Sequence, residues 1–226
     1  MTSMHGVDMG LGRLGDEVFE AVIFDMDGTL IDSTPAVARA WHTWAVEHQV
    51  SAEQLQGHHG VPSAGVVRLL LPEERRAAAI ERINELEIAD VHDIVVLPGA
   101  AEALASLADA RNAIATSCTR PLANARIAAA QLVPPSVVVT VDDVLRGKPH
   151  PDPFLEAARR LGVDPTRCLV VEDAPKGLQA AHAAGCFTLA VVTTTPRDEL
   201  DADAVVENLA SVAFDVVETG IRVRLV

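Results

Sequence analysis

The chain has few basic residues, few cysteines and no long hydrophobic run, and each shortage argues against a class of protein. Its 226 residues include 18 Lys and Arg against 32 Asp and Glu, a net charge of −14. This balance provides no basic surface for nucleic acid or an anionic membrane. No apolar run reaches 18 residues, so no membrane span is expected. The three cysteines, Cys118, Cys168 and Cys186, lack metal-binding spacing, and their odd number favours a reducing, cytoplasmic compartment over a disulfide framework.

The remaining composition is that of a globular protein. Hydrophobic residues make up 49% of the chain, enough for one large domain or a domain with an insertion. Residues 1–17 are rich in glycine and lack the charged-then-apolar order of a signal peptide, so they are predicted to form a loose N-terminal extension. No exposed heptad pattern is evident, and we expect a monomer.

Short apolar runs alternate with alanine-rich helical stretches along the chain. The predicted strands are residues 21–25, 112–116, 136–141, 168–172 and 187–192, with a weaker sixth at 204–207. The predicted helices are residues 99–109, 121–131, 153–161 and 175–184, with Gly162 and Gly185 at expected C-terminal caps. This alternation predicts an α/β fold with a doubly wound parallel sheet.

One interval, residues 34–97, interrupts this alternation with helical patterns and no convincing strand. Ser33-Thr34-Pro35 indicates a helix start, with Pro35 near the first helical position. We therefore predict a core domain of residues 18–33 and 98–226 and an inserted all-helical cap of residues 34–97. The insertion leaves after the first strand, so it would lie over the strand ends as a lid. Trp41 and Trp44, three residues apart, are expected in its core rather than on a ligand-binding surface.

Two carboxylates stand where the first predicted strand ends, in Asp25-Met26-Asp27-Gly28-Thr29-Leu30. Ligands of open α/β sheets bind at the carboxyl edge of the strands. Two acids this close repel each other unless a cation or a shared proton lies between them. The functional interpretation is a nucleophilic Asp25 and an acid/base Asp27 beside a metal. The alternative is a polar β-turn, because D-x-D-G also occurs in turns and calcium loops.

Ser117 and Lys148 follow later strands. Ser117 precedes a helix whose N-cap is predicted at Thr119, and a hydroxyl with backbone N–H groups at a helix N-terminus can bind an anion. Lys148 lies in a loop with three prolines, where a fixed ammonium can neutralise a phosphate during transfer. The alternatives are a residue that only caps the helix and an exposed loop lysine.

Glu172 and Asp173 end the strand at 168–172 and precede a helix near Pro175. Asp173 could join Asp25 as a hard oxygen ligand, which suits Mg²⁺; the alternative is N-capping of the helix. Because strands of a parallel sheet end at one edge, these acids should meet the hydroxyl and the lysine there.

These motifs resemble the haloacid dehalogenase-like hydrolase superfamily. DMDGTL, a hydroxyl at the second strand, GKPHPDPF and VVEDAPKGLQAAHAAG match its four motifs in order, over residues 21–192. The helical insertion resembles the cap of subfamily I. HGVPS at residues 59–63 and ATSCTRP at residues 115–121 most resemble its sugar- and polyol-phosphate phosphatases. The resemblance implies a Rossmann-like core with an inserted helical cap.

The resemblance also implies chemical roles. Asp25 would attack phosphorus to form an aspartyl-phosphate, and Asp27 would protonate the leaving alcohol and then activate water. Mg²⁺ would be held by Asp25, by the backbone carbonyl of Asp27 and by Asp173, with Glu172 orienting a metal-bound water. Ser117, or alternatively Thr116, would hold phosphoryl oxygens together with Lys148.

Further candidates concern the substrate. The set placed next to it is Gly28, Thr29, Ser117, Cys118, His59 and Arg120. His59 could equally be a solvated loop residue, and Arg120 a surface residue at a helix start. Because a helix N-terminus lowers a thiol pKa, we hypothesise that Cys118 makes the protein sensitive to oxidants.

The sequence thus predicts a Mg²⁺-dependent phosphatase acting on small sugar or polyol phosphate monoesters. One alternative is a sugar phosphomutase of the same superfamily, but such mutases carry His at the position of Val37. The other is a non-catalytic phosphate-binding regulatory protein. Haloacid dehalogenases themselves lack the second aspartate, so Asp27 argues against that activity. The expected partner is a small phosphorylated metabolite, with no nucleic acid and no membrane.

Overall fold

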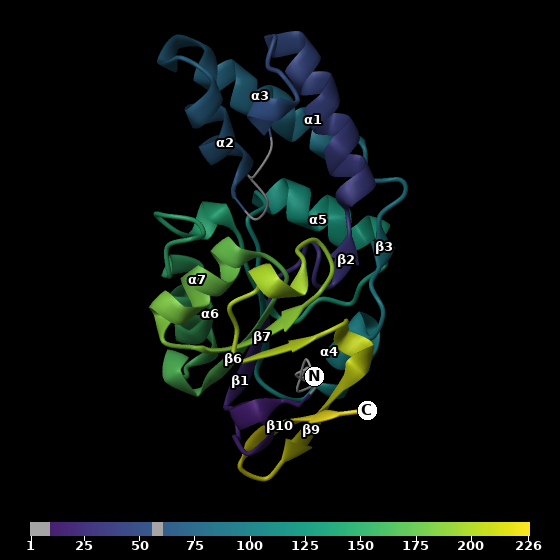
Figure 1. Cartoon of the computed structure of the whole chain (residues 1–226), viewed down its shortest axis with the longest axis vertical. Helices are drawn as coiled ribbons and strands as arrows, with labels where there is room; N and C mark the ends of the chain where they lie inside the picture. The colour runs from purple at the N-terminus through teal and green to yellow at the C-terminus, as the bar shows by residue number, and fades with distance from the viewer. Residues whose placement is uncertain (1–9, 56–60) are drawn as a thin grey trace, which may run out of the picture.

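The apolar run before Asp25 forms the central strand of a six-stranded parallel sheet (Figure 1). The computed structural model describes residues 10–55 and 61–226. The strands lie in the order β5-β4-β1-β6-β7-β8. Their bounds are β1 Ala21–Phe24, β4 Asn112–Ala115, β5 Val137–Val139, β6 Cys168–Glu172, β7 Phe187–Val191 and β8 Ala204–Val206. All six predicted strands and the doubly wound α/β fold are confirmed.

Both faces of this sheet are covered, which explains the unbroken apolar runs of its strands. Ile23 of β1 packs toward Phe154, on the face of α6 (Asp152–Leu161) and α7 (Pro175–Ala184). Its neighbour Phe24 joins the cluster that includes Leu104 and Leu122, on the face of α4 (Ala100–Ser106) and α5 (Arg120–Ala129). Helices α6 and α7 end at left-handed Gly162 and Gly185, as expected.

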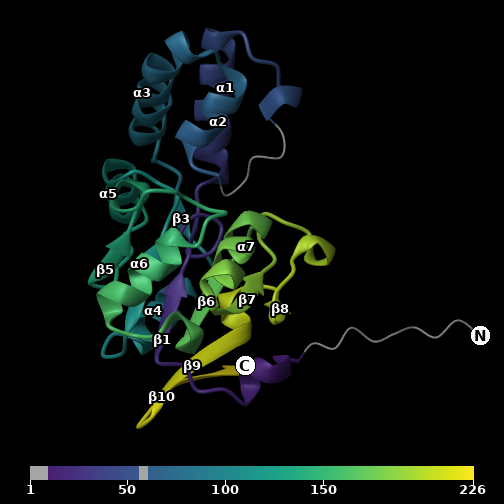
Figure 2. The ribbon, with the colours of Figure 1, turned by 90° about the vertical axis from the view of Figure 1, so that its left-hand side faces the viewer.

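Three helices stand beyond the carboxyl edge of the sheet and form what we call the helical layer (Figures 1 and 2). They are α1 Thr34–His48, α2 Ser63–Leu70 and α3 Glu73–Ala89. Trp44 is fully buried in their shared core, and its indole N–H donates to the Ala79 carbonyl at 2.8 Å. Trp41 packs edge-on against Trp44 but also lines a cavity described below, so it does more than fill the core.

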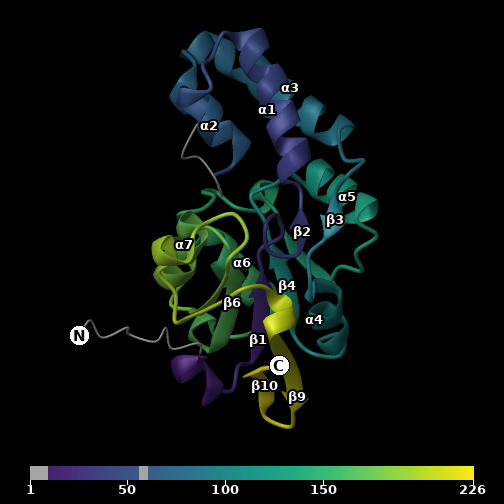
Figure 3. The same ribbon diagram turned by 45° about the vertical axis from the view of Figure 1, so that its right-hand side comes forward.

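The entry and return of the helical layer differ from the prediction of an insertion without strands. The chain enters the helical layer through β2 (Ile31–Asp32) and returns through β3 (Val95–Val96), and these two strands form a short antiparallel pair. Figure 3 shows this pair between the sheet and the helical layer. Two-residue strands carry too little alternation to be recognised in a sequence.

Two further segments differ from the prediction, which placed no strand after residue 207 and a loose extension at residues 1–17. β9 (Val212–Val217) and β10 (Gly220–Leu225) form an antiparallel hairpin that covers the α4 side of the core. Part of the predicted loose extension is also packed there, because Leu14 in the 3-10 turn η1 (Gly12–Gly15) and Leu11 just before it are buried. The remaining 3-10 turns are η2 Glu53–Leu55, η3 Val141–Asp143, η4 Pro165–Arg167, η5 Arg197–Glu199 and η6 Leu209–Ser211. Within the described ranges, no helix has the length and apolar character needed to cross a bilayer.

Candidate active site

Four charged side chains from three separate segments meet at the carboxyl edge of the sheet. Asp25 follows β1, Lys148 lies in the loop before α6, Glu172 ends β6, and Asp173 follows it. All four are at most 6% exposed. The Lys148 ammonium donates to Asp25 and, at 2.7 Å, to Glu172 Oε1, and it lies 5.2 Å from the Phe154 ring centre. The structure therefore brings together the acids and the lysine that the sequence singled out.

Glu172 is fixed by donors on both carboxylate oxygens. Besides the bond from Lys148 to Oε1, its Oε2 accepts from the backbone N–H groups of Asp173 and Ala174 at 2.8 and 2.9 Å. Gly177 of α7 leaves room for this carboxylate, since a Cβ there would lie 1.6 Å from Oε1. Glu172 therefore holds Lys148 in place and stabilises the turn from β6 into α7.

Replacing Gly177 by Ala is expected to displace Glu172 from these donors. Because Glu172 is buried and cannot swing into solvent, we expect a loss of about 2 kcal/mol in the free energy of unfolding. Urea denaturation would measure it, with the exposed Gln179→Ala on the same helix as the control. If Gly177→Ala were as stable as the control, the Glu172 carboxylate would not be fixed by these donors.

Asp173 approaches the backbone at Gly28. Gly28 has φ of 90°, and a Cβ there would lie 2.2 Å from Asp173 Oδ2, so both the conformation and the space require glycine. Thr29 Oγ1 donates to Asp173 Oδ1 at 3.4 Å, and the Thr194 hydroxyl donates to Oδ2. Thr29, predicted to face the substrate, thus contacts an acidic residue in the structure.

The cluster has more negative than positive charge. Burial, together with Glu172, Asp173 and Asp27, raises the pKa of Asp25 well above its usual range despite Lys148. Burial and then Glu172 raise the pKa of Asp173 to about 7. Oxygens of Asp25, Glu172 and Asp173 lie within 4.8 Å of one another, so this acidic group could hold a metal ion.

The carboxylate of Asp27 points toward a different set of partners. Its Oδ1 accepts from Ser33 Oγ at 2.7 Å and from Arg126 Nη1 at 2.8 Å, and its Oδ2 from Cys118 Sγ at 3.1 Å. Arg126 also donates through Nη2 to Glu87 Oε1 at 3.0 Å.

Sequence reasoning missed Arg126, Glu87 and the role of Ser33, although two signals existed. Arg126 lies four residues after Leu122, on the apolar face of α5, and Glu87 lies four residues after Ile83, on that of α3. A charged residue on the buried face of a helix points to a specific partner.

Of the two hydroxyl groups that follow β4, the position of Ser117 favours it as the one that faces a ligand. Ser117 lines the cavity, whereas Thr116 is 1% exposed and its Oγ1 accepts from the Cys118 N–H at 3.1 Å. Cys118 also lines the cavity, but burial and Asp27 raise its thiol pKa well above the ordinary value. The hypothesis of an oxidant-sensitive thiolate at Cys118 was therefore wrong in its premise.

The structure does not bring Arg120 into the site. Its guanidinium donates to Asp143 and, at 2.8 Å, to the Val138 carbonyl, and its backbone N–H donates to Asp142. These contacts favour the alternative that Arg120 is a surface residue at a helix start over a role in substrate binding. His59 lies outside the described residues.

A cavity of about 830 Å³ separates this sheet edge from the helical layer. Asp25, Asp27, Ser117, Glu172 and Asp173 line it from below. The helical layer adds Trp41 and polar groups of His42, Ser63, Asn84 and Glu87. A small molecule in this cavity would contact the acidic cluster and the helical layer together.

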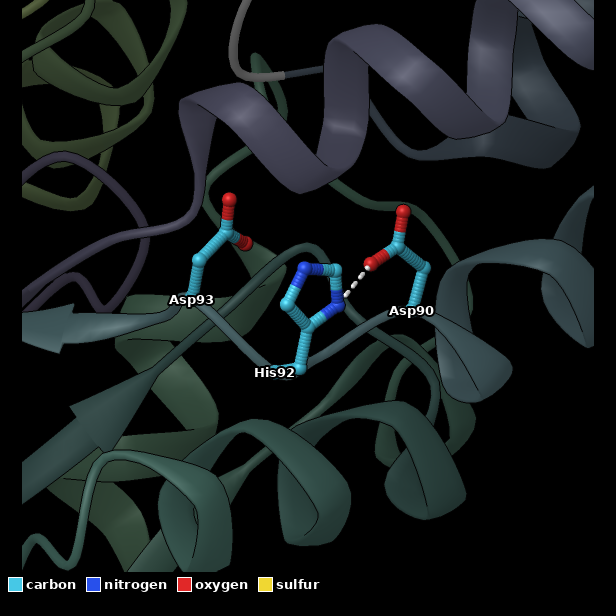
Figure 4. A group of neighbouring side chains, drawn as sticks. All are labelled: Asp90, His92 and Asp93. Carbon is cyan, nitrogen blue, oxygen red and sulfur yellow. Dashed lines mark ion pairs between the residues drawn. The ribbon is translucent and has the colours of Figure 1, made fainter.

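A second group that could hold a metal, Asp90, His92 and Asp93, lies in the connection from α3 to β3 (Figure 4). His92 Nδ1 is 2.8 Å from Asp90 Oδ1, the dashed contact in the figure. Arg39 of α1 occupies both acids, with four bonds of 2.7–2.8 Å. These bonds therefore link α1 to the connection between α3 and β3, and the Arg39 guanidinium already neutralises the two acids.

The model of the haloacid dehalogenase-like hydrolases matches residues 19–185, which include all of the clustered acids and Lys148. The chain belongs to this family. Several of its relatives by sequence are named as phosphatases. Hexitol phosphatase A of Escherichia coli strain K12 is 42% identical over 79% of this chain and 87% of the relative. Glycerol-1-phosphate phosphohydrolase 2 of Saccharomyces cerevisiae is 32% identical over 85% of this chain and 83% of the relative.

Solved structures agree with the fold. The crystal structure of a hydrolase from Pseudomonas syringae covers 84% of this chain and 94% of its own, with a TM-score of 0.77 and 28% identity. The expected family, fold and class of enzyme, a phosphoric monoester hydrolase, are thus confirmed.

Proposed function

We propose that this protein is a Mg²⁺-dependent phosphatase of small sugar or polyol phosphate monoesters. The observation that supports it most is the buried Asp25–Lys148–Glu172–Asp173 cluster, which opens into a cavity roofed by the helical layer. The phosphatase relatives act on a hexitol phosphate and on glycerol 1-phosphate by their names. The cavity offers hydroxyl, amide and imidazole groups suited to a polyol.

Asp25 would act as the nucleophile. Its carboxylate oxygen attacks phosphorus, the ester P–O bond breaks, and Asp27 gives its proton to the departing alkoxide. Water then attacks the phosphorus of the aspartyl-phosphate while Asp27 takes up its proton, the bond between phosphorus and the Asp25 oxygen breaks, and inorganic phosphate leaves. Lys148 and Ser117 neutralise and orient the phosphoryl oxygens, which is most of what phosphoryl transfer requires.

The residues present fit Mg²⁺. Their donors are hard carboxylate oxygens, and the cluster has three acids against one ammonium. Asp25 and Asp173 are the side chains that would hold the ion, with the Asp27 carbonyl, because Glu172 is committed to Lys148 and to two backbone N–H groups, whereas the side-chain donors to Asp173 among the described residues are two hydroxyl groups. When bound, Mg²⁺ supplies positive charge that lets a carboxylate and a phosphate approach each other.

We further propose that residues 34–97 are a cap that closes over the core of residues 18–33 and 98–226, within one monomer. Its helices share a core of their own, and its two connections lie side by side as β2 and β3. Val37 lines the cavity, so the place where related mutases carry His has no titratable side chain. This favours release of phosphate over its return to the sugar.

Phosphate release from a panel of hexitol, hexose and glycerol phosphates tests the proposal. We expect turnover of a few related esters with Mg²⁺ and a loss of at least about 100-fold in excess EDTA, because the two anions then repel each other. Release that is unaffected by EDTA would contradict the metal site. Turnover only after addition of a sugar bisphosphate would indicate a mutase, and tight binding without turnover a regulatory protein.

A further inference from the structure

One buried guanidinium joins the acid/base candidate to the helical layer. Arg126 of α5 is 4% exposed and lies between two carboxylates. Nη1 donates to Asp27 Oδ1 at 2.8 Å, and Nη2 donates to Glu87 Oε1 at 3.0 Å. Asp27 follows β1 of the core, whereas Glu87 belongs to the last turn of α3, so this contact crosses between the two parts of the molecule.

Glu87 is itself fixed by the helical layer. It is 4% exposed, and its second oxygen, Oε2, accepts from Ser63 Oγ at 3.0 Å. Ser63 begins α2, so this carboxylate links α2 and α3 to Arg126. Glu87, Ser63, Arg126 and Asp27 all line the same cavity.

The orientation of Asp27 depends on this arrangement. A buried charge is stable only while its partners are in place, because its interaction with water has been lost. If α3 moved away, Arg126 would lose Glu87 at Nη2, and only Nη1, which donates to Asp27 and at 3.2 Å to Cys118 Sγ, would still hold its guanidinium. Were the guanidinium then to turn away, the Ser33 and Cys118 bonds alone would leave Asp27 without a positive partner among the described residues.

We propose that Arg126 is a positioning residue for proton transfer and that Glu87 fixes it, so that Asp27 is held ready only while the helical layer covers the site. The proposal rests on the function proposed above, in which Asp27 is the acid and base. In this proposal, Asp27 reaches its working orientation when the helical layer closes over the site. A misplacement of about 1 Å at such a group can cost about 100-fold in rate.

Two esters with different leaving groups can distinguish a role in proton transfer from a general role in stabilising the fold. A polyol leaves as a strongly basic alkoxide and needs the proton of Asp27, whereas p-nitrophenol leaves readily without one. The test measures kcat and KM for glycerol 1-phosphate and the pre-steady-state burst of p-nitrophenol from p-nitrophenyl phosphate. The variants are Glu87→Gln, which is close to isosteric, and Arg126→Met.

We expect Glu87→Gln to lower kcat on glycerol 1-phosphate about tenfold and Arg126→Met about 100-fold, with KM within about threefold. The p-nitrophenol burst rate should fall less than about threefold, because that step needs little protonation. If Glu87 acts through Arg126, the double variant should be no slower than Arg126→Met alone. If Arg126→Met folds poorly, the nearly isosteric Glu87→Gln variant still tests the proposal by itself.

Arg82→Met and Glu47→Gln are the matched controls. These residues form the same kind of pair at 2.7 Å, but it joins α3 to α1 within the helical layer and is exposed. Both controls should keep kcat within about twofold, since exposed pairs contribute little.

The outcomes distinguish this proposal from the proposed function. Equal losses for the two esters, a change in KM alone, additive losses in the double variant, or unchanged kinetics would overturn the positioning role and leave the phosphatase intact. A wild-type protein that hydrolyses neither ester with Mg²⁺ would overturn the proposed function and the positioning role with it.

Discussion

Replacing Asp25 by Asn is expected to lower phosphate release by at least about 10⁴-fold, because an amide oxygen cannot form the aspartyl-phosphate. Asp25 stands at the end of β1, 6% exposed, with Lys148 and the open cavity on either side of it. The measurement is phosphate release under single-turnover conditions, with Mg²⁺ and the best ester of the panel.

The stability of the same variant separates lost chemistry from lost structure. The folded pKa of Asp25 lies above its ordinary value, so its ionisation opposes folding as the pH rises toward neutrality. Without metal, Asp25→Asn should therefore melt at the same temperature as the wild type or higher at pH 7. The exposed Asp198→Asn controls for the chemical change. Residual turnover above about 1% of wild type would exclude Asp25 as the nucleophile.

Replacing Lys148 by Met should lower both turnover and stability. The ammonium is the only cation bonded to Asp25 and Glu172 among the described side chains. Removing the ammonium leaves the buried carboxylates of Asp25, Glu172 and Asp173 without its positive charge. It also removes the fixed positive charge beside the phosphoryl group during transfer. We expect a fall in kcat of about 10³-fold. In EDTA the free energy of unfolding should fall by about 3 kcal/mol at pH 8.

The loss of stability should depend on pH in a definite direction. The folded pKa of Asp173 is about 7, above the unfolded value, so its contribution to stability is present at low pH and lost as the pH rises toward 7. Without Lys148 the carboxylate pKa values rise further, so the deficit should be smaller at pH 5 than at pH 8. Urea titrations at both pH values measure it, and Lys176→Met, which changes the chain's other lysine, is the control. An equal deficit at both pH values would contradict this electrostatic account.

The lysine and the acids illustrate how far local sequence can be interpreted. Asp25, Ser117, Lys148 and Glu172-Asp173 each follow or precede a strong strand or helix signal, and parallel strands must end at one edge. Their convergence at one edge therefore follows from the strand pattern together with the parallel sheet that it predicts. Arg120 and Cys118 stand in the same motifs, yet their environments differ from the prediction. Asp143 takes up the guanidinium of Arg120, and burial beside Asp27 raises the thiol pKa of Cys118.

The sequence by itself determined the parallel sheet, the helices and which acids follow its strands, because these depend on hydrophobic period and turn residues. Only the tertiary structure decided which side chains face one another. The bridge from Asp27 through Arg126 to Glu87 joins residues 99 and 39 positions apart in the chain. Burial then gives these charges their strength, and burial depends on packing between elements rather than on the local sequence.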